Sequence, residues 1–308
     1  MPVDDARDHP RIRGRGHPLP FSKGRMATTL FLAGFDPERS YMIAREVERE
    51  VTAGQADEIS LDELHVLVED VLAREEGEPT VARYRAWQRV LHLERPLILL
   101  IGGGTGTGKS SLATEIAYRL GISRIVSTDA VRQVMRAFFA PALMPALHYS
   151  SFEAGDGLRM PMPDPDEADR ALYGFIQQAE QVAVGAAAVV DRAIVEGLST
   201  VVEGVHLVPG LIAPEHHGRA LVAQVMLMIE DEEAHQSHFV ARDATAGEAR
   251  ALPRYLRRFG EIRRVQDYLV ARAERMGVPV VESSDGEAAL RAVLDLILAQ
   301  ATALPEPG

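Results

Sequence analysis

Residues 103–110 carry the pattern with the most direct chemical meaning: Gly-Gly-Thr-Gly-Thr-Gly-Lys-Ser, a full match to G-x-x-x-x-G-K-S. In such a loop the glycines let successive backbone N–H groups turn toward an anion, and the following helix adds its positive end. The lysine reaches the β- and γ-phosphates of a nucleotide, and the serine ligates Mg²⁺. We therefore predict an ATP·Mg²⁺ site with Lys109 catalytic and Ser110 on the metal. The nucleotide-binding residues are predicted to be Gly103, Gly104, Thr105, Gly106, Thr107, Gly108, Lys109, Ser110 and Ser111.

The use of basic residues strengthens this interpretation. The 33 basic residues comprise 31 arginines and two lysines, Lys23 and Lys109. A lysine ammonium is a compact charge on a flexible stem, whereas an arginine guanidinium is a planar fork that fits poorly between two phosphates. Lys23, which precedes Gly24 at a helix start, is a second candidate for a phosphate contact. Neither lysine lies in the Asn/Thr-Lys-x-Asp pattern of guanine-specific proteins, which argues against a GTPase.

Two carboxylates compete for the place beside Mg²⁺ or the transferred phosphate. Glu203 ends the segment Ser-Thr-Val-Val-Glu, and Glu230 ends Met-Leu-Met-Ile-Glu. Asp231, which follows Glu230, stands where an acidic residue normally caps the next helix, so this pair of acids has an ordinary structural explanation. We favour Glu203 as the metal-binding and substrate-binding carboxylate, with Glu230 as the alternative.

A second polar cluster follows the strand-like segment 124–127, which ends in Ser-Thr-Asp and leads into a helix with two arginines. Strand ends at the carboxyl edge of an α/β sheet face the ligand crevice. Asp129 at this edge can orient or deprotonate an acceptor hydroxyl, and we predict it to be catalytic. Arg132 and Arg136 are predicted to bind an anionic acceptor. The alternative is that Asp129 only caps the helix.

The region from Arg242 to Arg264 is basic in an otherwise acidic chain. It holds seven arginines and three acids, a local charge of +4, whereas the whole chain carries −12. Such a segment suits a lid that closes over phosphates, although a solvated helix face is the simpler alternative. We predict Arg242 to be catalytic and Arg250 and Arg254 to bind the acceptor. His235 and His238 are spaced H-x-x-H without a third ligand pattern, so we predict no zinc site.

These residues require a parallel α/β sheet to position them. Leu97–Ile101 is an apolar run typical of a central strand, and the phosphate loop that follows leads into a helix ending at Gly121. Segments 124–127, 200–203, 221–229 and 278–281 resemble further strands, with helices between them, including a long one over 166–197. Residues 140–165, rich in Pro and Met, show no period. We assign residues 94–308 to this domain.

The preceding residues have a different pattern. Residues 19–93 show helical periodicity, with starts at Asp36-Pro37 and Ser60, and we predict a small all-helical domain. Residues 1–18, polar and broken by prolines, are predicted to be a flexible arm.

Composition sets outer limits. A chain of 308 residues can hold two domains, and 46 % hydrophobic and 25 % charged residues are ordinary for a globular protein. The net charge of −12 argues against nucleic-acid binding, and the absence of cysteine excludes disulfides and thiolate metal sites. No run approaches the ~18 apolar residues of a membrane span. We expect a cytoplasmic protein with a small-molecule substrate; the sequence does not fix its oligomeric state.

With these residues in view, the chain resembles the 2-phosphoglycerate kinases. The motifs that carry the resemblance are the loop at 101–111, Ser-Thr-Asp-Ala-Val-Arg-Gln-Val-Met-Arg (127–136), Ser-Ser-Phe-Glu-Ala (150–154), Val-Glu-Gly-Val-His-Leu-Val-Pro-Gly (202–210), His-Phe-Val-Ala-Arg (238–242) and Ile-Arg-Arg-Val-Gln-Asp-Tyr-Leu (262–269). The resemblance implies a three-layer P-loop kinase fold similar to nucleoside-monophosphate kinases, with Ser151 among the acceptor-binding residues. It also implies ATP-dependent phosphorylation of the 3-hydroxyl of 2-phosphoglycerate.

The N-terminal residues, to about residue 92, resemble an ATP-cone, a helical nucleotide-sensing domain. Two other functions stay open from the sequence. One is a kinase for another small acceptor, in which the lid arginines bind ATP alone. The other is a non-catalytic regulatory protein that senses ATP.

Overall fold

The computed structural model describes residues 10–13, 17–54, 58–158, 167–212, 217–246 and 252–303, with the backbone alone at 167–169, 217 and 241–246. The chain divides into two compact units, Met1–Leu93 and Glu94–Gly308. Each unit has its own hydrophobic core. None of the helices in the described part of the chain combines the length and the apolarity that a membrane crossing needs.

The N-terminal unit is built on four helices: α1 (Lys23–Leu32), α2 (Pro37–Ala53), α3 (Leu61–Glu75) and α4 (Glu78–Leu91). Their starts follow the sequence signals, because Asp36 caps α2 and Ser60 forms a reciprocal capping box with Glu63 at α3. Side chains such as Leu30, Val68 and Leu72 meet in a dry core. Lys23 forms an ion pair with Glu48 of α2, at 3.0 Å between Nζ and Oε2.

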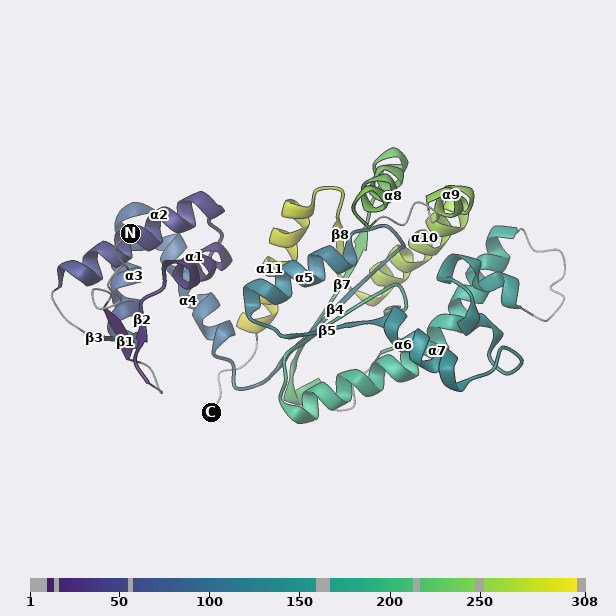
Figure 1. The fold of residues 1–308 in the computed structure, drawn as a ribbon, viewed down its shortest axis with the longest axis horizontal. Coiled ribbons are helices and arrows are strands. Elements are labelled where there is room, and N and C mark those ends of the chain that lie inside the picture. Colours follow the sequence, from purple (N-terminus) through teal and green to yellow (C-terminus); the bar gives the residue numbers. More distant parts are fainter. Residues whose placement is uncertain are drawn as a thin grey trace, which may run out of the picture. The chain divides into compact units, whose positions relative to one another are not determined.

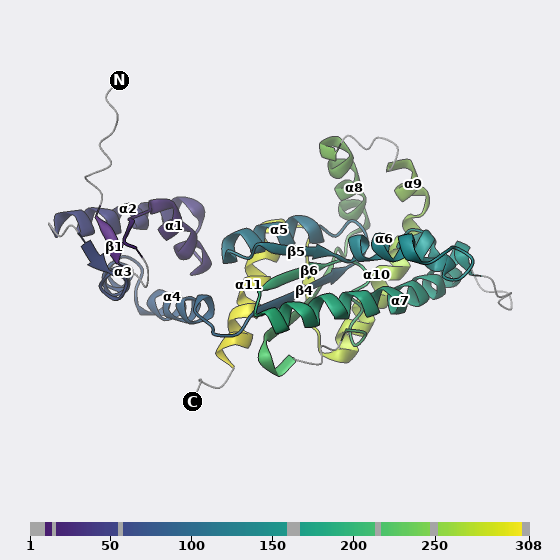
Figure 2. The same ribbon diagram turned by 60° about the horizontal axis from the view of Figure 1, so that its bottom comes forward.

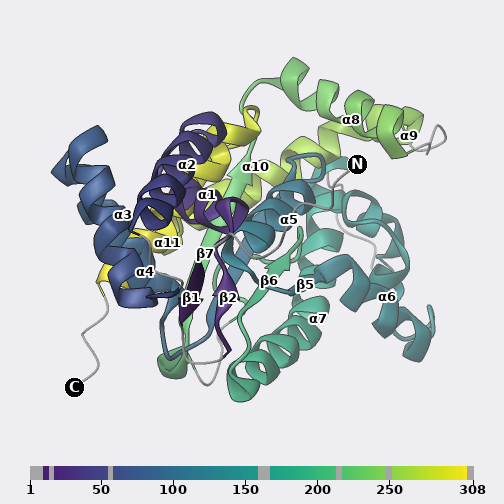
Figure 3. The same cartoon turned by 60° about the vertical axis from the view of Figure 1, so that its left-hand side comes forward.

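This unit also contains a small sheet that the sequence pattern did not predict. Its strands are β1 (Arg11–Arg13), β2 (Leu19–Pro20) and β3 (Glu58–Ser60), in the order β2-β1-β3. β1 runs antiparallel to β2, which lies beside it in Figure 3, and parallel to β3. The all-helical prediction therefore missed three strands, and the predicted flexible arm over 1–18 is wrong at Arg11–Arg13. Strands of two or three residues are too short to show an alternating pattern.

The second unit is a three-layer α/β domain around a five-stranded sheet (Figure 1). Its strands are β4 (Leu97–Gly103), β5 (Arg124–Ser127), β6 (Thr200–Glu203), β7 (Leu221–Met228) and β8 (Val280–Glu282), all parallel in the order β5-β6-β4-β7-β8. The predicted strands are confirmed to within two residues at each end. Every residue of the central strand β4 is buried, as its apolar run requires.

Helices cover both faces of this sheet. α5 (Lys109–Leu120) and α11 (Gly286–Thr302) pack on one face, and α7 (Glu167–Glu196) and α10 (Phe259–Met276) pack on the other, as Figures 1 and 2 show. The remaining helices are α6 (Thr128–Phe138), α8 (Glu232–Ala246) and α9 (Leu252–Arg257).

The segment without a period holds two 3₁₀ helices, η1 (Pro145–His148) and η2 (Ser151–Gly157), with residues 159–166 outside the description. Because the strands are parallel, the segments that leave their carboxyl ends gather at one edge of the sheet, with β4 at the point where the chain turns to either side.

Candidate active site

The phosphate loop joins β4 to α5, and its backbone requires glycine at defined points. Gly103, Gly106 and Gly108 have φ angles of +148°, +90° and +76°. A Cβ atom on Gly103 would lie 2.6 Å from the carbonyl oxygen of Leu227 on the neighbouring strand β7. Thr107, fully buried, donates its hydroxyl to the Gly104 carbonyl at 3.0 Å. The loop is therefore held in one conformation by its own residues and by the next strand.

Lys109, Ser110 and Ser111 form the first turn of α5. The Lys109 ammonium crosses the loop and donates to the carbonyl oxygen of Gly104 at 2.5 Å. Ser110 and Ser111 are exposed. Gly108 stands at the N-cap and offers no side chain to the first amides of the helix. These amides are thus available to an anion, and the helix dipole favours negative charge there.

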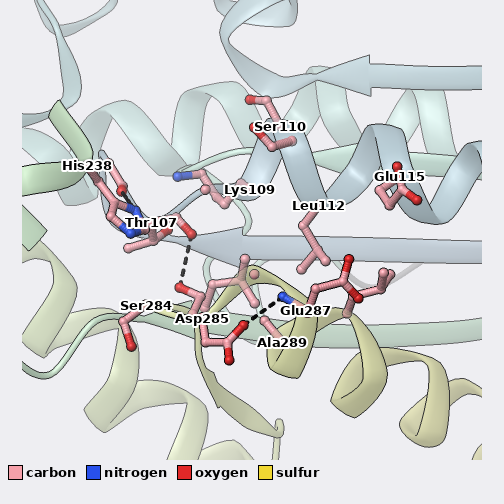
Figure 4. Close-up of a pocket in the computed structure, with 17 residues that line it drawn as sticks. Thr107, Lys109, Ser110, Leu112, Glu115, His238, Ser284, Asp285, Glu287 and Ala289 are labelled. Carbon is pink, nitrogen blue, oxygen red and sulfur yellow. Dashed lines mark hydrogen bonds between the residues drawn. The ribbon is translucent and has the colours of Figure 1, made fainter. Parts of the chain in front are cut away.

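A cavity of about 910 Å³ adjoins the loop (Figure 4). One wall is formed by residues 106–112, and the facing wall by Ser283–Glu287 and the start of α11. The two walls are joined by Ser283, which donates its hydroxyl to the Thr107 carbonyl at 3.0 Å. Within the second wall, Asp285 caps α11 by accepting from the Glu287 amide at 2.9 Å. The cavity lies within the size range of small-molecule sites and opens directly on the phosphate loop.

The second predicted cluster lies at the start of α6. Ser127 is the N-cap of this helix, since its hydroxyl accepts from the amide of Asp129 at 3.1 Å. The alternative that Asp129 serves as the cap is therefore wrong. Its carboxylate accepts from Nε of Arg132 at 3.2 Å, and its side chain is 62 % exposed. An exposed carboxylate held by a buried cation is free to face a substrate.

Arg132 and Arg136 differ in their surroundings. Arg132 is 8 % exposed and donates through Nη1 to the carbonyls of Leu147 at 3.0 Å and Tyr149 at 2.9 Å. Arg136 is half-buried and donates to Gln133. Arg132 therefore fastens the irregular segment around η1 to the helix that bears Asp129.

The two competing carboxylates lie in unlike places. Glu203 ends β6 beside the central strand, in register with Ile101, and is 6 % exposed. Glu230 follows β7 and is exposed. Asp231 accepts from the amide of Ala234 at 2.7 Å, as the helix-cap explanation requires.

The lid prediction can be examined in part. Arg250 lies outside the described residues, and for Arg242 only the backbone, within α8, is described. Arg254 on α9 donates through Nε to Glu153 at 2.7 Å and through Nη2 to Ser150 at 2.8 Å. Its guanidinium also lies over the ring of Phe152. Helix α9 thus contacts the 150–154 segment, in which Ser151 is buried at 8 % exposure.

A buried network that sequence reasoning missed joins these pieces. His206 is fully buried; its Nδ1 lies 2.9 Å from the Thr128 hydroxyl and its Nε2 lies 3.0 Å from Oε1 of Gln178. Gln178 turns its amide nitrogen to the carbonyl of Tyr149 at 3.1 Å, so its oxygen must face the imidazole. Nε2 of His206 therefore carries the proton, and Nδ1 accepts from Thr128.

Burial lowers the pKa of His206 to about 4, and its largest electrostatic influences are Asp129, Arg132 and Lys109. The charges of these three residues thus all act on one buried ring that follows β6. A histidine just after a strand-ending Glu-Gly was the available sequence signal, but its partners lie on other elements.

The His206 pKa predicts how stability depends on pH. Between pH 6.5 and 4 the unfolded chain binds this proton and the folded chain does not, so stability falls as pH falls through this window. We expect wild type to lose about 2 kcal/mol more than His206→Gln between pH 7 and pH 5. Urea unfolding of both proteins at the two pH values measures the difference. Equal losses would show that His206 does not resist protonation.

His235 and His238 also have partners that their spacing did not reveal. His235 is fully buried with Nε2 2.8 Å from the carbonyl of Thr105, and Nδ1 of His238 lies 3.2 Å from the carbonyl of Gly106. No group of three or more His, Cys, Asp or Glu residues in the described ranges is placed to hold a metal ion.

Comparison with known proteins covers both units of the chain. Residues 11–92 match the ATP cone domain family. The chain is 39 % identical over 274 residues to the 2-phosphoglycerate kinase of Methanothermobacter thermautotrophicus, covering 89 % of both chains. It is 42 % identical over 274 residues to that of Methanopyrus kandleri, covering 89 % of this chain and 82 % of the relative. With that of Methanocaldococcus jannaschii it shares 37 % identity over 272 residues, covering 88 % of this chain and 85 % of the relative. The chain therefore belongs to the 2-phosphoglycerate kinase family.

Proposed function

We propose that this protein transfers the γ-phosphoryl group of ATP to the 3-hydroxyl of 2-phosphoglycerate, which yields ADP and 2,3-bisphosphoglycerate. The observation that carries the proposal is that Lys109 and Asp129 both follow strands of the same parallel sheet in a chain of this family. Lys109 lies in the glycine-rich loop, and Asp129 is bonded to Arg132. A donor phosphate and an acceptor hydroxyl can meet between them.

On this proposal, ATP places its phosphates on residues 103–111. The amides of the loop and of the first turn of α5 face the anion, and Lys109 leaves the Gly104 carbonyl to contact the β- and γ-phosphates. The rest of the nucleotide occupies the cavity between the loop and Ser283–Glu287. This assignment needs no change in the walls, which are already hydrogen-bonded to each other.

The residues at the loop fit a magnesium ion that arrives with ATP. Mg²⁺ prefers oxygen ligands and is commonly held by one or two protein groups together with substrate phosphates. Ser110 supplies an exposed hydroxyl, and Glu203 supplies a buried carboxylate at the end of the strand beside β4. When bound there, the ion would neutralise charge on the β- and γ-phosphates.

The acceptor faces Asp129. The Asp129 carboxylate orients the 3-hydroxyl of the acceptor and takes its proton. The hydroxyl oxygen attacks the γ-phosphorus of ATP, and the bond between this phosphorus and the bridging oxygen of the leaving ADP breaks. The acceptor's phosphate and carboxylate call for cations, which Arg132, Arg136 and Arg254 are proposed to supply, with Ser151 as a further acceptor contact. Arg254 would exchange Glu153 for substrate on binding. Arg242 and Arg250 are proposed to complete the lid, with Arg242 neutralising the transferred group.

Replacement of the two acids separates their roles. Glu203→Gln is expected to lower kcat by about a hundredfold and to raise the Mg²⁺ concentration needed for half-maximal rate, because it removes a charge from the metal and phosphate site. Glu230→Gln, at an exposed position outside β6, should keep wild-type kinetics. Magnesium titrations of initial rate on both variants give the answer; the reverse pattern would assign the metal to Glu230.

A coupled ADP-release assay tests the function as a whole. With ATP and Mg²⁺, 2-phosphoglycerate should stimulate ADP release well above 3-phosphoglycerate, glycerate or sugars, with 2,3-bisphosphoglycerate detected by ³¹P NMR. Stimulation by a different acceptor would contradict the substrate assignment and leave a small-molecule kinase. Tight ATP binding without stimulation by any acceptor would contradict catalysis and support an ATP-sensing protein.

A further inference from the structure

The face of α8 that carries His235, His238 and Phe239 lies directly on the phosphate loop. The two imidazoles contact consecutive loop carbonyls, Nε2 of His235 at Thr105 and Nδ1 of His238 at Gly106. A Cβ atom on Gly106 would come within 2.5 Å of the Phe239 ring and 3.1 Å of Nε2 of His235. Helix and loop are therefore packed without a gap.

The tautomer of His235 follows from this contact. A carbonyl oxygen accepts and never donates, so Nε2 of His235 must carry the proton. Burial lowers the pKa of His235; the hydrogen bond to Thr105 opposes this, and the neighbouring Arg263, His238 and Lys109 add to the lowering. The ring is therefore neutral, and its Nδ1 is buried without a hydrogen-bond partner among the described residues. Its hydrogen bond goes to the phosphate loop.

Aromatic packing fixes the ring plane. His235 stacks on Phe239 with centroids 5.4 Å apart and an interplanar angle of 20°, and the edge of Phe259 from α10 packs at 5.4 Å. Phe239 in turn stacks on Tyr255 of α9 at 5.0 Å. The direction of the Nε2–H bond is thus set by rings from three helices, with little freedom to follow the loop if the loop moved.

The planarity of the peptide bond turns this contact into a functional one. The C=O of Thr105 and the N–H of Gly106 belong to one rigid plane and point in opposite directions. A hydrogen bond that holds the carbonyl toward α8 therefore holds the Gly106 N–H away from α8. The same holds for the Gly106 carbonyl and the Thr107 N–H. These are loop amides of the kind that bind phosphate oxygens.

We propose that His235 is a positioning residue that orients the phosphate loop, by fixing the Thr105–Gly106 peptide through its Nε2–H. This proposal rests on the proposed function only in that ATP binds to residues 103–111. Within the loop, the side chains of Thr107 and Lys109 hydrogen-bond to the carbonyl of Gly104, which belongs to the preceding peptide. The helix that leads into the lid segment supplies the restraint.

The test compares two amides of similar size at this position. The side-chain nitrogen of His235→Gln reaches the place of Nε2 and can donate to Thr105, whereas that of His235→Asn ends near the place of Nδ1. We expect His235→Gln to bind Mg·ADP within about threefold of wild type, and His235→Asn to bind it about tenfold more weakly, the loss of one hydrogen bond. kcat should follow the same order. Titration calorimetry with Mg·ADP and steady-state kinetics measure both.

Two controls accompany this test. Circular dichroism and thermal unfolding must show that both variants are folded. Arg192→Ala, at a side chain of α7 that is 76 % exposed and pairs with Glu196 on the same helix, should leave Mg·ADP binding unchanged. Equal affinities of the Gln and Asn variants, whether both normal or both impaired, would overturn the proposal. Because ADP binding needs no acceptor, a wild-type protein that binds ADP but fails to phosphorylate 2-phosphoglycerate would overturn only the proposed function.

Discussion

Lys109→Ala is expected to lower kcat by on the order of 10³-fold while the protein stays folded. Negative charge builds up on the transferred phosphoryl group, and the ammonium is the cation that starts α5 beside it. In the structure it already spans the loop to Gly104. ADP binding should weaken much less than kcat, because the loop amides still hold the phosphates. Single-turnover kinetics with titration calorimetry separate the two effects.

Two further variants define what the loss means. Lys109→Arg keeps the charge but replaces a compact ammonium with a planar fork, and should recover only a minor part of the rate. Arg192→Ala removes a cation from α7 whose side chain is 76 % exposed and pairs with Glu196 on the same helix. That variant should behave as wild type. A folded Lys109→Ala enzyme with near-normal turnover would rule out the assigned donor site.

Asp129→Asn is the second large effect that we expect, a fall in kcat of about 10² to 10⁴-fold with Mg·ADP affinity unchanged. The amide keeps the size of the side chain and can still accept from Arg132, so the helix start and the η1 segment should stay in place. It cannot take a proton from the acceptor hydroxyl. Rapid-quench measurement of the phosphoryl-transfer step isolates this effect from product release.

Asp231→Asn is the matched control. Asp231 is also an acid at the start of a helix that follows a strand, and its carboxylate accepts from the Ala234 amide. Asparagine caps helices about as well, so rate and stability should hardly change. If Asp129→Asn and Asp231→Asn lost activity equally, a specific role for Asp129 would be untenable. A rise in the acceptor KM without a change in kcat would assign Asp129 to binding alone.

Several features could be predicted because they are properties of short stretches of chain. The phosphate loop needs its glycines for its own backbone angles, and Lys109 and Ser110 follow at fixed spacing. The apolar run of β4 and the periodic pattern of α7 report burial directly. The strands β1 and β3 were not predicted because three residues carry no periodic signal. Their pairing joins residues far apart in the sequence, since Arg11 of β1 lies in register with Glu58 of β3.

The contacts that orient the site belong to the tertiary structure. Thr105 and His235 are 130 positions apart in the sequence, and Thr128 and His206 are 78 apart. In the sequence His235 showed only its H-x-x-H spacing with His238, and Asp129 could be interpreted as a helix cap, because composition and spacing do not say which atoms lie opposite.

The sequence by itself determined the donor loop, the order of strands and helices along the chain, and the acids and arginines available for catalysis. The tertiary structure decided how these meet. Parallel pairing of β5, β6, β4 and β7 brings their carboxyl ends to one edge of the sheet. Ser127 and Glu203, which are 76 positions apart in the sequence, therefore become neighbours. Burial in the folded domain then gives each side chain its own environment. Asp129 is exposed, Glu203 is buried, and the His206 ring is neutral because burial lowers its pKa. Backbone preference acts within a few residues, whereas burial and hydrogen bonding depend on the whole packed domain.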